Sequence, residues 1–174
     1  AHGDPLVLPK ASDKFDFEGE LVMVIAKTGR HVAEADALDM IYGWSLFNDG
    51  SVRDYQRKAS QWTMGKNFDG TGAFGPDIVT ADEVTPGGVS LQLQTRVSGE
   101  TMQNANTRDL IFPIAKLIWH LTEVMTLEAG DIVVTGTPEG VGYARTPPRF
   151  MVPGDTVDIE VEQVGVLSNP VVAE

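Results

Sequence analysis

The chain has no cysteine, few basic residues and no long hydrophobic run. The lack of cysteine excludes disulfides and thiolate metal ligands. Lysine and arginine number 13 against 25 acidic residues, and the formal net charge is −12, which opposes binding to nucleic acid or to anionic lipid. The longest apolar run, 21–26, is strand-sized and too short to span a bilayer. We therefore expect no nucleic-acid partner, no membrane partner and, by default, a cytoplasmic location.

The length and the spacing of turn residues indicate a single, mainly β domain. A chain of 174 residues, 42% of them hydrophobic, is long enough to bury a sizeable core. Its 18 glycines and 10 prolines are spread evenly, which favours short strands and many turns. Periodicity predicts strands at 15–26, 41–47, 89–97, 101–103, 132–134, 155–161 and 165–167. It predicts helices at 36–40, 52–60 and 109–124, and a glycine-rich loop at 64–76. These elements indicate a mainly β fold with few helices outside it.

Two acidic residues, Glu18 and Glu20, stand two apart in a predicted strand. Their carboxylates therefore project from the same face. Like charges that lie this close resist burial, and a hard divalent cation resolves the conflict because Mg²⁺, Mn²⁺ and Ca²⁺ prefer carboxylate oxygens. A solvated strand end is the simpler interpretation of these two residues alone.

A second group of polar residues, Asp49, Arg53 and Gln56, follows the second predicted strand. Spacings of four and three place them on one face of a helix. A carboxylate, a guanidinium and an amide on one face can hold a metal, an anion and a water. The alternatives are a capping role for Asp49 and a surface ion pair between Asp49 and Arg53.

Two further segments have features of a binding site. Lys66 has apolar neighbours in 62–68, which suggests that its ammonium group lies in a cleft. The segment 135–142, TGTPEGVG, follows a buried strand, and its glycines, N–H groups and Thr137 hydroxyl suit an anion; a plain turn is the alternative. The pattern GTGAFG at 70–75 is not a dinucleotide site because no helix follows it. The three histidines show no ligand or triad spacing.

Taken in order, the segments FEGEL (17–21), NDGSVRDYQ (48–56), Lys66 and TGTPEGVG (135–142) resemble the fumarylacetoacetate hydrolase family. The resemblance covers nearly the whole chain and is strongest to the bacterial branch that acts on acylpyruvates and on products of aromatic ring cleavage. It implies a rolled, mainly β sheet fold, a β-roll or mixed barrel, and a homodimer. It also implies a C–C hydrolase that cleaves acylpyruvate-type or fumarylpyruvate-type 2,4-dioxo acids through a metal-bound enolate.

The resemblance assigns roles to individual residues of this chain. Glu18, Glu20 and Asp49 are expected to bind Mg²⁺ or Mn²⁺, with Ca²⁺ as a substitute in crystals. Arg53, Gln56, Lys66 and Thr137 are expected to bind the anionic 2-oxo acid, and Lys66 and Gln56 to take part in catalysis.

One departure from the family pattern leaves the reaction open. Relatives carry a His and a Glu on a lid upstream of the E-x-E strand, and that pair activates water. Only seventeen residues precede Glu18 here, so the lid or N-terminal region is expected to be missing from the single catalytic domain 1–174. A decarboxylase or a 2-hydroxyhepta-2,4-diene-1,7-dioate isomerase is therefore the alternative activity. A metal-binding subunit without catalysis is the alternative of another class.

Overall fold

The computed structural model describes all residues, 1–174, and is mainly β. The strands are β1 (Leu6–Leu8), β2 (Phe15–Asp16), β3 (Gly19–Ile25), β4 (Ile41–Asn48), β5 (Ser51–Val52), β6 (Ala73–Thr80), β7 (Gln92–Val97), β8 (Glu100–Asn106), β9 (Ile132–Val134), β10 (Thr156–Val161) and β11 (Gly165–Ala173). The α-helices are α1 (Arg53–Gln56) and α2 (Ile114–Val124), and 3-10 helices cover Glu34–Met40, Trp62–Gly65, Pro86–Gly88, Thr107–Asp109 and Gly142–Ala144.

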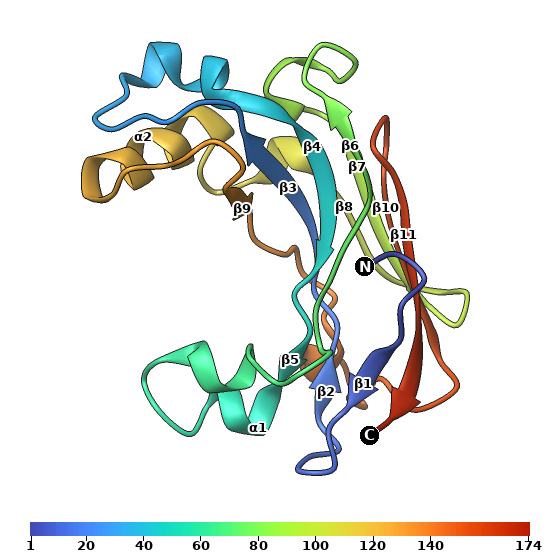
Figure 1. Ribbon diagram of the computed structural model, residues 1–174. Coiled ribbons are helices and arrows are strands. Elements are labelled where there is room, and N and C mark those ends of the chain that lie inside the picture. The colour runs from blue at the N-terminus through green and yellow to red at the C-terminus, as the bar shows by residue number, and fades with distance from the viewer.

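Two curved sheets and a short ribbon make up the framework (Figure 1). The larger sheet has the order β1–β11–β10–β7–β8, the smaller one β6–β4–β3–β9, and β2 pairs with β5. All pairs are antiparallel except β1 with β11. Strands β3 and β4 contact β10, and the core lies between the two sheets. The sheets stay open, so the predicted rolled, mainly β fold is confirmed without closure into a barrel.

Strand β3 is the central strand of the smaller sheet, between β4 and β9. All seven of its residues are buried, which agrees with the continuous apolar run that predicted it. Strand β10, between β11 and β7, buries alternate residues, Val157, Ile159 and Val161, as an alternating sequence requires. Strand β10 was predicted close to its observed bounds, whereas the single strand predicted at 15–26 is divided into β2 and β3, which belong to different sheets.

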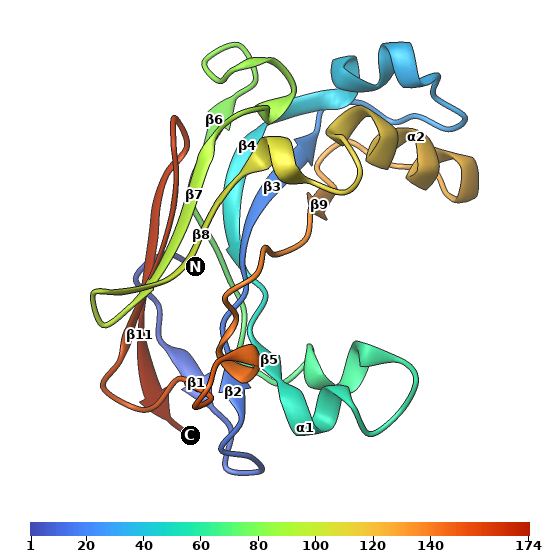
Figure 2. The same cartoon turned by 180° about the vertical axis from the view of Figure 1, so that it is seen from behind.

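Two of the three predicted helices are shorter than their sequence patterns predict, and the third, predicted at 36–40, is the 3-10 helix Glu34–Met40. Helix α2 begins at Ile114, directly after Pro113, and not at 109. The residue before a proline disfavours the α region, and Ile111 consequently lies outside the helix with 89% of its surface exposed. The predicted helix at 52–60 is a single turn, α1, which ends at Gln56. Helix α2 packs mainly against the 3-10 helix Glu34–Met40, and α1 lies at the opposite end of the molecule (Figure 2).

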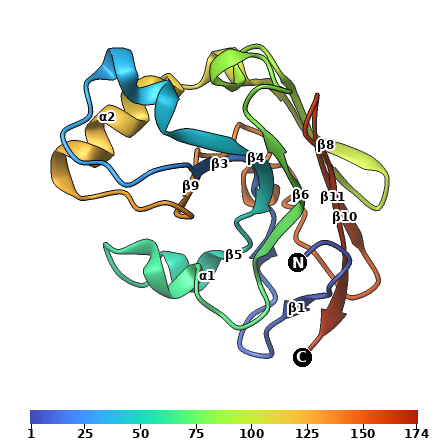
Figure 3. The same cartoon turned by 45° about the horizontal axis from the view of Figure 1, so that its top comes forward.

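The prediction of a loop at 64–76 is wrong in part. Its first residues close the 3-10 helix Trp62–Gly65, and its last residues belong to β6, which pairs with β4 along the sheet edge. Gly75 and Pro76 look like loop residues in the sequence. They are tolerated in β6 because an edge strand need not donate every N–H group. Figure 3 shows β6 beside β4 in a third orientation.

None of the helices combines the length and the apolar character that crossing a membrane requires.

Candidate metal centre

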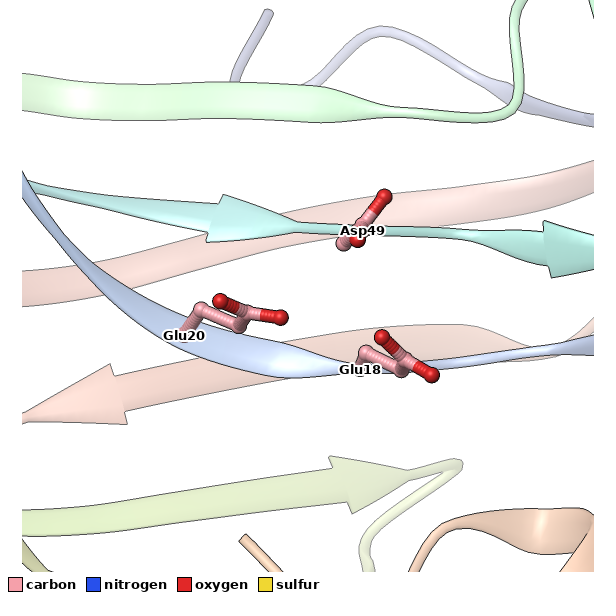
Figure 4. Close-up of side chains that lie close together, drawn as sticks. All are labelled: Glu18, Glu20 and Asp49. Carbon is pink, nitrogen blue, oxygen red and sulfur yellow. The ribbon is translucent and has the colours of Figure 1, made fainter. Parts of the chain in front are cut away.

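Three acidic side chains converge where the paired strands β3 and β4 end: Glu20 lies in β3, Glu18 directly precedes that strand, and Asp49 directly follows β4 (Figure 4). One carboxylate oxygen from each of Glu18, Glu20 and Asp49 lies within 4.8 Å of the other two. Strand pairing causes the convergence, because Gly19 lies opposite Asn48 in the register of β3 and β4. The Asp49 N–H group donates to the Glu18 carbonyl oxygen at 2.9 Å, which holds the two carboxylates side by side.

Burial makes this cluster costly without a cation. Glu18 and Glu20 are 8% and 3% exposed, and Asp49 is half-buried. Burial raises the pKa of Glu20 from 4.5 to about 8; the N–H group of Gly136 opposes the rise, and the charges of Asp49 and Glu18 add to it. Burial also raises the pKa of Asp49, against the hydrogen bond from Lys66. The folded chain thus resists carrying three negative charges at this point.

Lys66 and Arg53 supply the positive charge that faces the cluster. The Lys66 ammonium nitrogen lies 2.7 Å from Glu18 Oε2 and 2.6 Å from Asp49 Oδ2. Arg53 Nη1 donates to Glu18 Oε1 at 2.5 Å and to Gln56 Oε1 at 3.1 Å. Lys66 therefore faces inward as predicted, although its apolar neighbours Trp62 and Met64, from which this was inferred, are 66% and 63% exposed.

Arg53 does not pair with Asp49, so the predicted alternative of a surface ion pair is wrong. The guanidinium is buried and its Nε instead donates to Asp16 Oδ2 at 2.8 Å. Asp16 is fully buried and also accepts the N–H groups of Phe17, Gly142 and Tyr143 at 2.8–2.9 Å. Asp16 thereby orients Arg53. It also holds Gly142 and Tyr143 in place, a few residues after 135–138, which we call the TGTP segment.

The balance of charge fits a divalent cation. Two cations, Lys66 and Arg53, face four carboxylates, those of Asp16, Glu18, Glu20 and Asp49. Arg57 and Glu139 also line the cavity and offset each other. Once Glu20 has lost its proton, the excess is therefore two negative charges, which one dication would balance. Clustered carboxylate oxygens are also the donors that Mg²⁺, Mn²⁺ and Ca²⁺ prefer.

The TGTP segment forms the wall beside Glu20. The Gly136 N–H group donates to Glu20 Oε2 at 2.5 Å, and the Thr137 hydroxyl donates to the Gly19 carbonyl oxygen at 3.0 Å. Gln103 Nε2 donates to the same hydroxyl at 2.8 Å. The only proton of the Thr137 hydroxyl is therefore used inside the protein, so this hydroxyl can reach a ligand only as an acceptor.

All seven candidate residues line one cavity of about 740 Å³, a size typical of small-molecule sites. They are Glu18, Glu20, Asp49, Arg53, Gln56, Lys66 and Thr137. Arg57, Trp62 and Tyr143 line it as well, and the Tyr143 ring lies 4.6 Å from the Arg53 guanidinium carbon and 4.5 Å from that of Arg57. No histidine lines this cavity.

The sequence contained a signal for one of the residues that the motifs missed. Asp16 has the same parity as Glu18 and Glu20, so the alternation of a strand places it on their side of the chain. Gln103 and Tyr143 carry no such signal. Their positions depend on which strands and loops become neighbours in the folded chain.

Comparison with known proteins identifies the family. The model of the fumarylacetoacetate (FAA) hydrolase C-terminal family matches residues 1–172. The oxaloacetate tautomerase YisK of Bacillus subtilis is 41% identical over 171 residues, which are 98% of this chain and 56% of that protein. The structure of 2-hydroxyhepta-2,4-diene-1,7-dioate isomerase from Mycobacterium marinum is 40% identical with a TM-score of 0.90, over 99% of this chain and 64% of that one. The structure of maleylpyruvate hydrolase from Sphingobium sp. SYK-6 is 38% identical with a TM-score of 0.86, over 99% and 61%.

A mainly β fold whose cavity gathers three carboxylates defines this chain as a candidate metal-binding protein. The chain belongs to the fumarylacetoacetate hydrolase family, as the order of its motifs predicted. It spans little more than half the length of the curated relatives that it matches. The names of these similar proteins include a tautomerase, an isomerase and a hydrolase. Membership of the family therefore does not by itself determine the reaction.

Proposed function

We propose that this chain is the catalytic part of a divalent-metal-dependent enzyme that interconverts the keto and enol forms of a small 2-oxo acid such as oxaloacetate. The convergence of Glu18, Glu20 and Asp49 beside Lys66 and Arg53 carries the proposal. The tautomerase name of several relatives that are about 41% identical supports this reaction.

The three carboxylates would hold the cation, for which Mg²⁺ or Mn²⁺ suits the donor set. A bound dication supplies Lewis-acid stabilisation of the negative charge that develops on the 2-oxo oxygen. Lys66 and Arg53 offset the charge of the carboxylates, so an anion can enter the site of an acidic protein.

Three polar residues of the cavity have a part in this reaction. Gln56 Oε1 accepts from Arg53, which leaves the amide hydrogens of Gln56 to orient the substrate. Arg53 is fixed by Asp16 and binds a carboxylate of the substrate. Lys66, an ammonium group beside Glu18 and Asp49, would give a proton to C3 of the enol, and the proton of the enol hydroxyl would return to the Lys66 amine. Keto–enol exchange needs one proton moved from carbon to oxygen, so it requires no activated water.

A second candidate is the hydrolysis of a C–C bond in an acylpyruvate or fumarylpyruvate, and one feature favours it. A second cavity of about 400 Å³, with apolar residues such as Leu21, Leu93 and Phe112, shares Gly136–Glu139 with the site. It has room for an acyl substituent that oxaloacetate lacks. The likeness to maleylpyruvate hydrolase agrees with this use. The diene-dioate isomerase reaction is the related alternative without hydrolysis.

The test follows oxaloacetate and an acylpyruvate by ultraviolet absorbance and proton NMR, with Mg²⁺ and with a chelator. Tautomerisation predicts metal-dependent enol–keto exchange and deuterium uptake at C3 with the carbon skeleton intact. Hydrolysis predicts two acids from the acylpyruvate, and decarboxylation predicts carbon dioxide.

Lys66→Met should remove the activity, and Lys58→Met should not, because Lys58 lies on the Tyr55 ring and outside the cavity. A wild-type protein with no metal-dependent exchange would contradict the proposal.

The homodimer, the cytoplasmic location and the single-domain boundary 1–174 stay predictions of the sequence.

A further inference from the structure

Gln103 is a fully buried polar residue that no motif of the sequence marks. It lies in β8, on the larger sheet, while the three candidate ligands come from the smaller sheet and its continuation. A buried amide must have its hydrogen bonds satisfied, because an unpaired one costs free energy. The hydrogen-bond partners of Gln103 therefore show which segments this residue connects.

The partners of Gln103 belong to the two segments that form the site. Its Oε1 accepts the Gly19 N–H group at 3.0 Å, between Glu18 and Glu20. Its Nε2 donates to Thr137 Oγ1 at 2.8 Å and to the Pro138 carbonyl oxygen at 2.9 Å. The ring of contacts closes because the Thr137 hydroxyl donates to the Gly19 carbonyl oxygen at 3.0 Å.

The ring of hydrogen bonds is closely packed, and it leaves no space for a side chain at Gly19. A Cβ on Gly19 would overlap Thr95 Oγ1 and would lie 3.3 Å from Gln103 Oε1. Thr95 is the partner of Gln103 in the pairing of β7 with β8. The backbone between the two glutamates thus lies directly on the larger sheet, at the place where Gln103 reaches the TGTP segment.

We propose that Gln103 is a positioning residue. It holds residues 135–140, which form one wall of the cavity, at a set distance from Glu18 and Glu20. Substrate bound between the wall and the cation then meets both in the right geometry. The role rests on the proposed function, since it assumes that a 2-oxo acid binds between Thr137 and the carboxylates. Gln103 does not line the cavity and acts through its hydrogen bonds with Gly19 and Thr137.

The test compares Gln103→Leu, Thr137→Val and the double variant with the wild type. Affinity for oxalate, an analogue that cannot enolise, is measured by calorimetry on the Mg²⁺-loaded proteins. Gln103→Leu should weaken oxalate binding about 10- to 100-fold, the loss that follows when a residue supporting the ligands of a metal site is changed. Because Gln103 acts through Thr137, the double variant should be little worse than Gln103→Leu alone.

Gln94→Leu is the matched control, because Gln94 lies in β7 of the same sheet and bonds only to neighbouring side chains at the surface. A second measurement, hydrogen exchange of the metal-free proteins, needs neither metal nor substrate. Gln103→Leu should speed exchange in 135–141, and Gln94→Leu should not. If Gln103→Leu does not fold, Gln103→Asn replaces it, with the same polar atoms on a shorter side chain and the same expectations.

Two results would overturn the positioning role: oxalate binding by the Gln103 variant equal to that of the Gln94 control, or additive effects of the Gln103 and Thr137 changes. Wild-type protein that binds no oxalate with Mg²⁺ present would instead contradict the proposed function. In that case the exchange of 135–141 alone decides the role of Gln103, and unchanged exchange refutes it.

Discussion

At the scale of single residues, Glu20 illustrates why a buried carboxylate indicates a function. Its side chain is almost fully buried and accepts only the Gly136 N–H group, and burial raises its pKa to about 8. Such a group lowers stability when it is charged and alone. A role that requires the charge, such as binding a cation, gives a physical reason for its presence.

The substitution Glu20→Gln tests that role. The amide oxygen can still accept from Gly136, but the negative ligand charge is lost. Changes at residues that only support the metal ligands lower metal affinity by roughly 10–100-fold. We expect Glu20→Gln to lower Mg²⁺ affinity by more than this, and turnover to be lost with it. Stability of the metal-free protein should not fall. Titration calorimetry measures the affinity, and Glu128→Gln is the control because Glu128 is exposed and outside the cavity. Unchanged affinity would remove Glu20 from the ligand set.

The raised pKa of Glu20 also predicts how metal binding depends on pH. Between its usual pKa of 4.5 and the folded-state value of about 8, the folded protein holds a proton that the unfolded chain has released. Stability of the metal-free protein should therefore decrease as pH rises through this window. Mg²⁺ must displace the proton, so its affinity should rise about tenfold per pH unit for one proton and level off above about pH 8.

Calorimetry at several pH values, in buffers with different ionisation enthalpies, counts the released protons. The pKa of Asp49 is raised in the same direction, which steepens the slope. Glu20→Gln should flatten it. An affinity that does not change with pH below 8 would contradict the assignment.

At the scale of elements, the single turn α1 and the 3-10 helix Trp62–Gly65 act as one unit that positions Lys66. Gly65 makes their contact possible, since a Cβ there would lie 2.5 Å from Gln56 Cα. The sequence predicted a longer helix and a loop instead. Apolar spacing at 52–60 did not reveal that a second short helix would pack on the first turn.

Gly65→Ala should therefore displace Lys66 without changing it. Overpacking of this kind costs about 1–3 kcal/mol, so the free energy of unfolding in urea should fall by that amount. Turnover should fall further than stability explains, because the ammonium group leaves Glu18 and Asp49. Gly72→Ala is the control, since its nearest neighbour is the tip of the Phe47 ring at 3.1 Å. Equal losses of turnover and of unfolding free energy in the two variants would show that the contact between Gly65 and α1 does not position Lys66.

Strands were easier to predict than helix ends for a physical reason. The buried run of β3 and the alternation of β10 are properties of the local sequence. Strand β6 is different, because Gly75 and Pro76 suit it only as an edge strand beside β4. The pairing of strands decided that outcome, and the local sequence does not contain it.

At the scale of the whole molecule, the site is a product of topology. Antiparallel pairing of β3 with β4 brings Asp49 to Glu18, and the chain after β9 returns along β3 to place Gly136 and Thr137 beside Glu20. The order of the motifs identified the family, and the family pattern named the seven cavity residues. Asp16 and Gln103 belong to no such motif, and their contacts could be found only from the folded chain.

This topology predicts that a dication stabilises the entire domain. A cation held by Glu18, Glu20 and Asp49 would tie β3 to the end of β4 and would occur only in the folded state. At a Mg²⁺ concentration 100 times Kd, such linkage adds about 2.7 kcal/mol, which raises the Tm of a chain this long by roughly 5–11 °C. Differential scanning fluorimetry with Mg²⁺, Mn²⁺ and a chelator measures the shift.

Glu20→Gln should abolish the shift and Glu128→Gln should keep it. The shift should also grow as pH rises toward 8, because fewer molecules then hold the competing proton on Glu20. If Mg²⁺, Mn²⁺ and Ca²⁺ all leave the Tm of the wild type unchanged at pH 8, the three carboxylates do not form a metal site. A proton on Glu20, which burial favours by raising its pKa to about 8, would then relieve the negative charge in place of a cation.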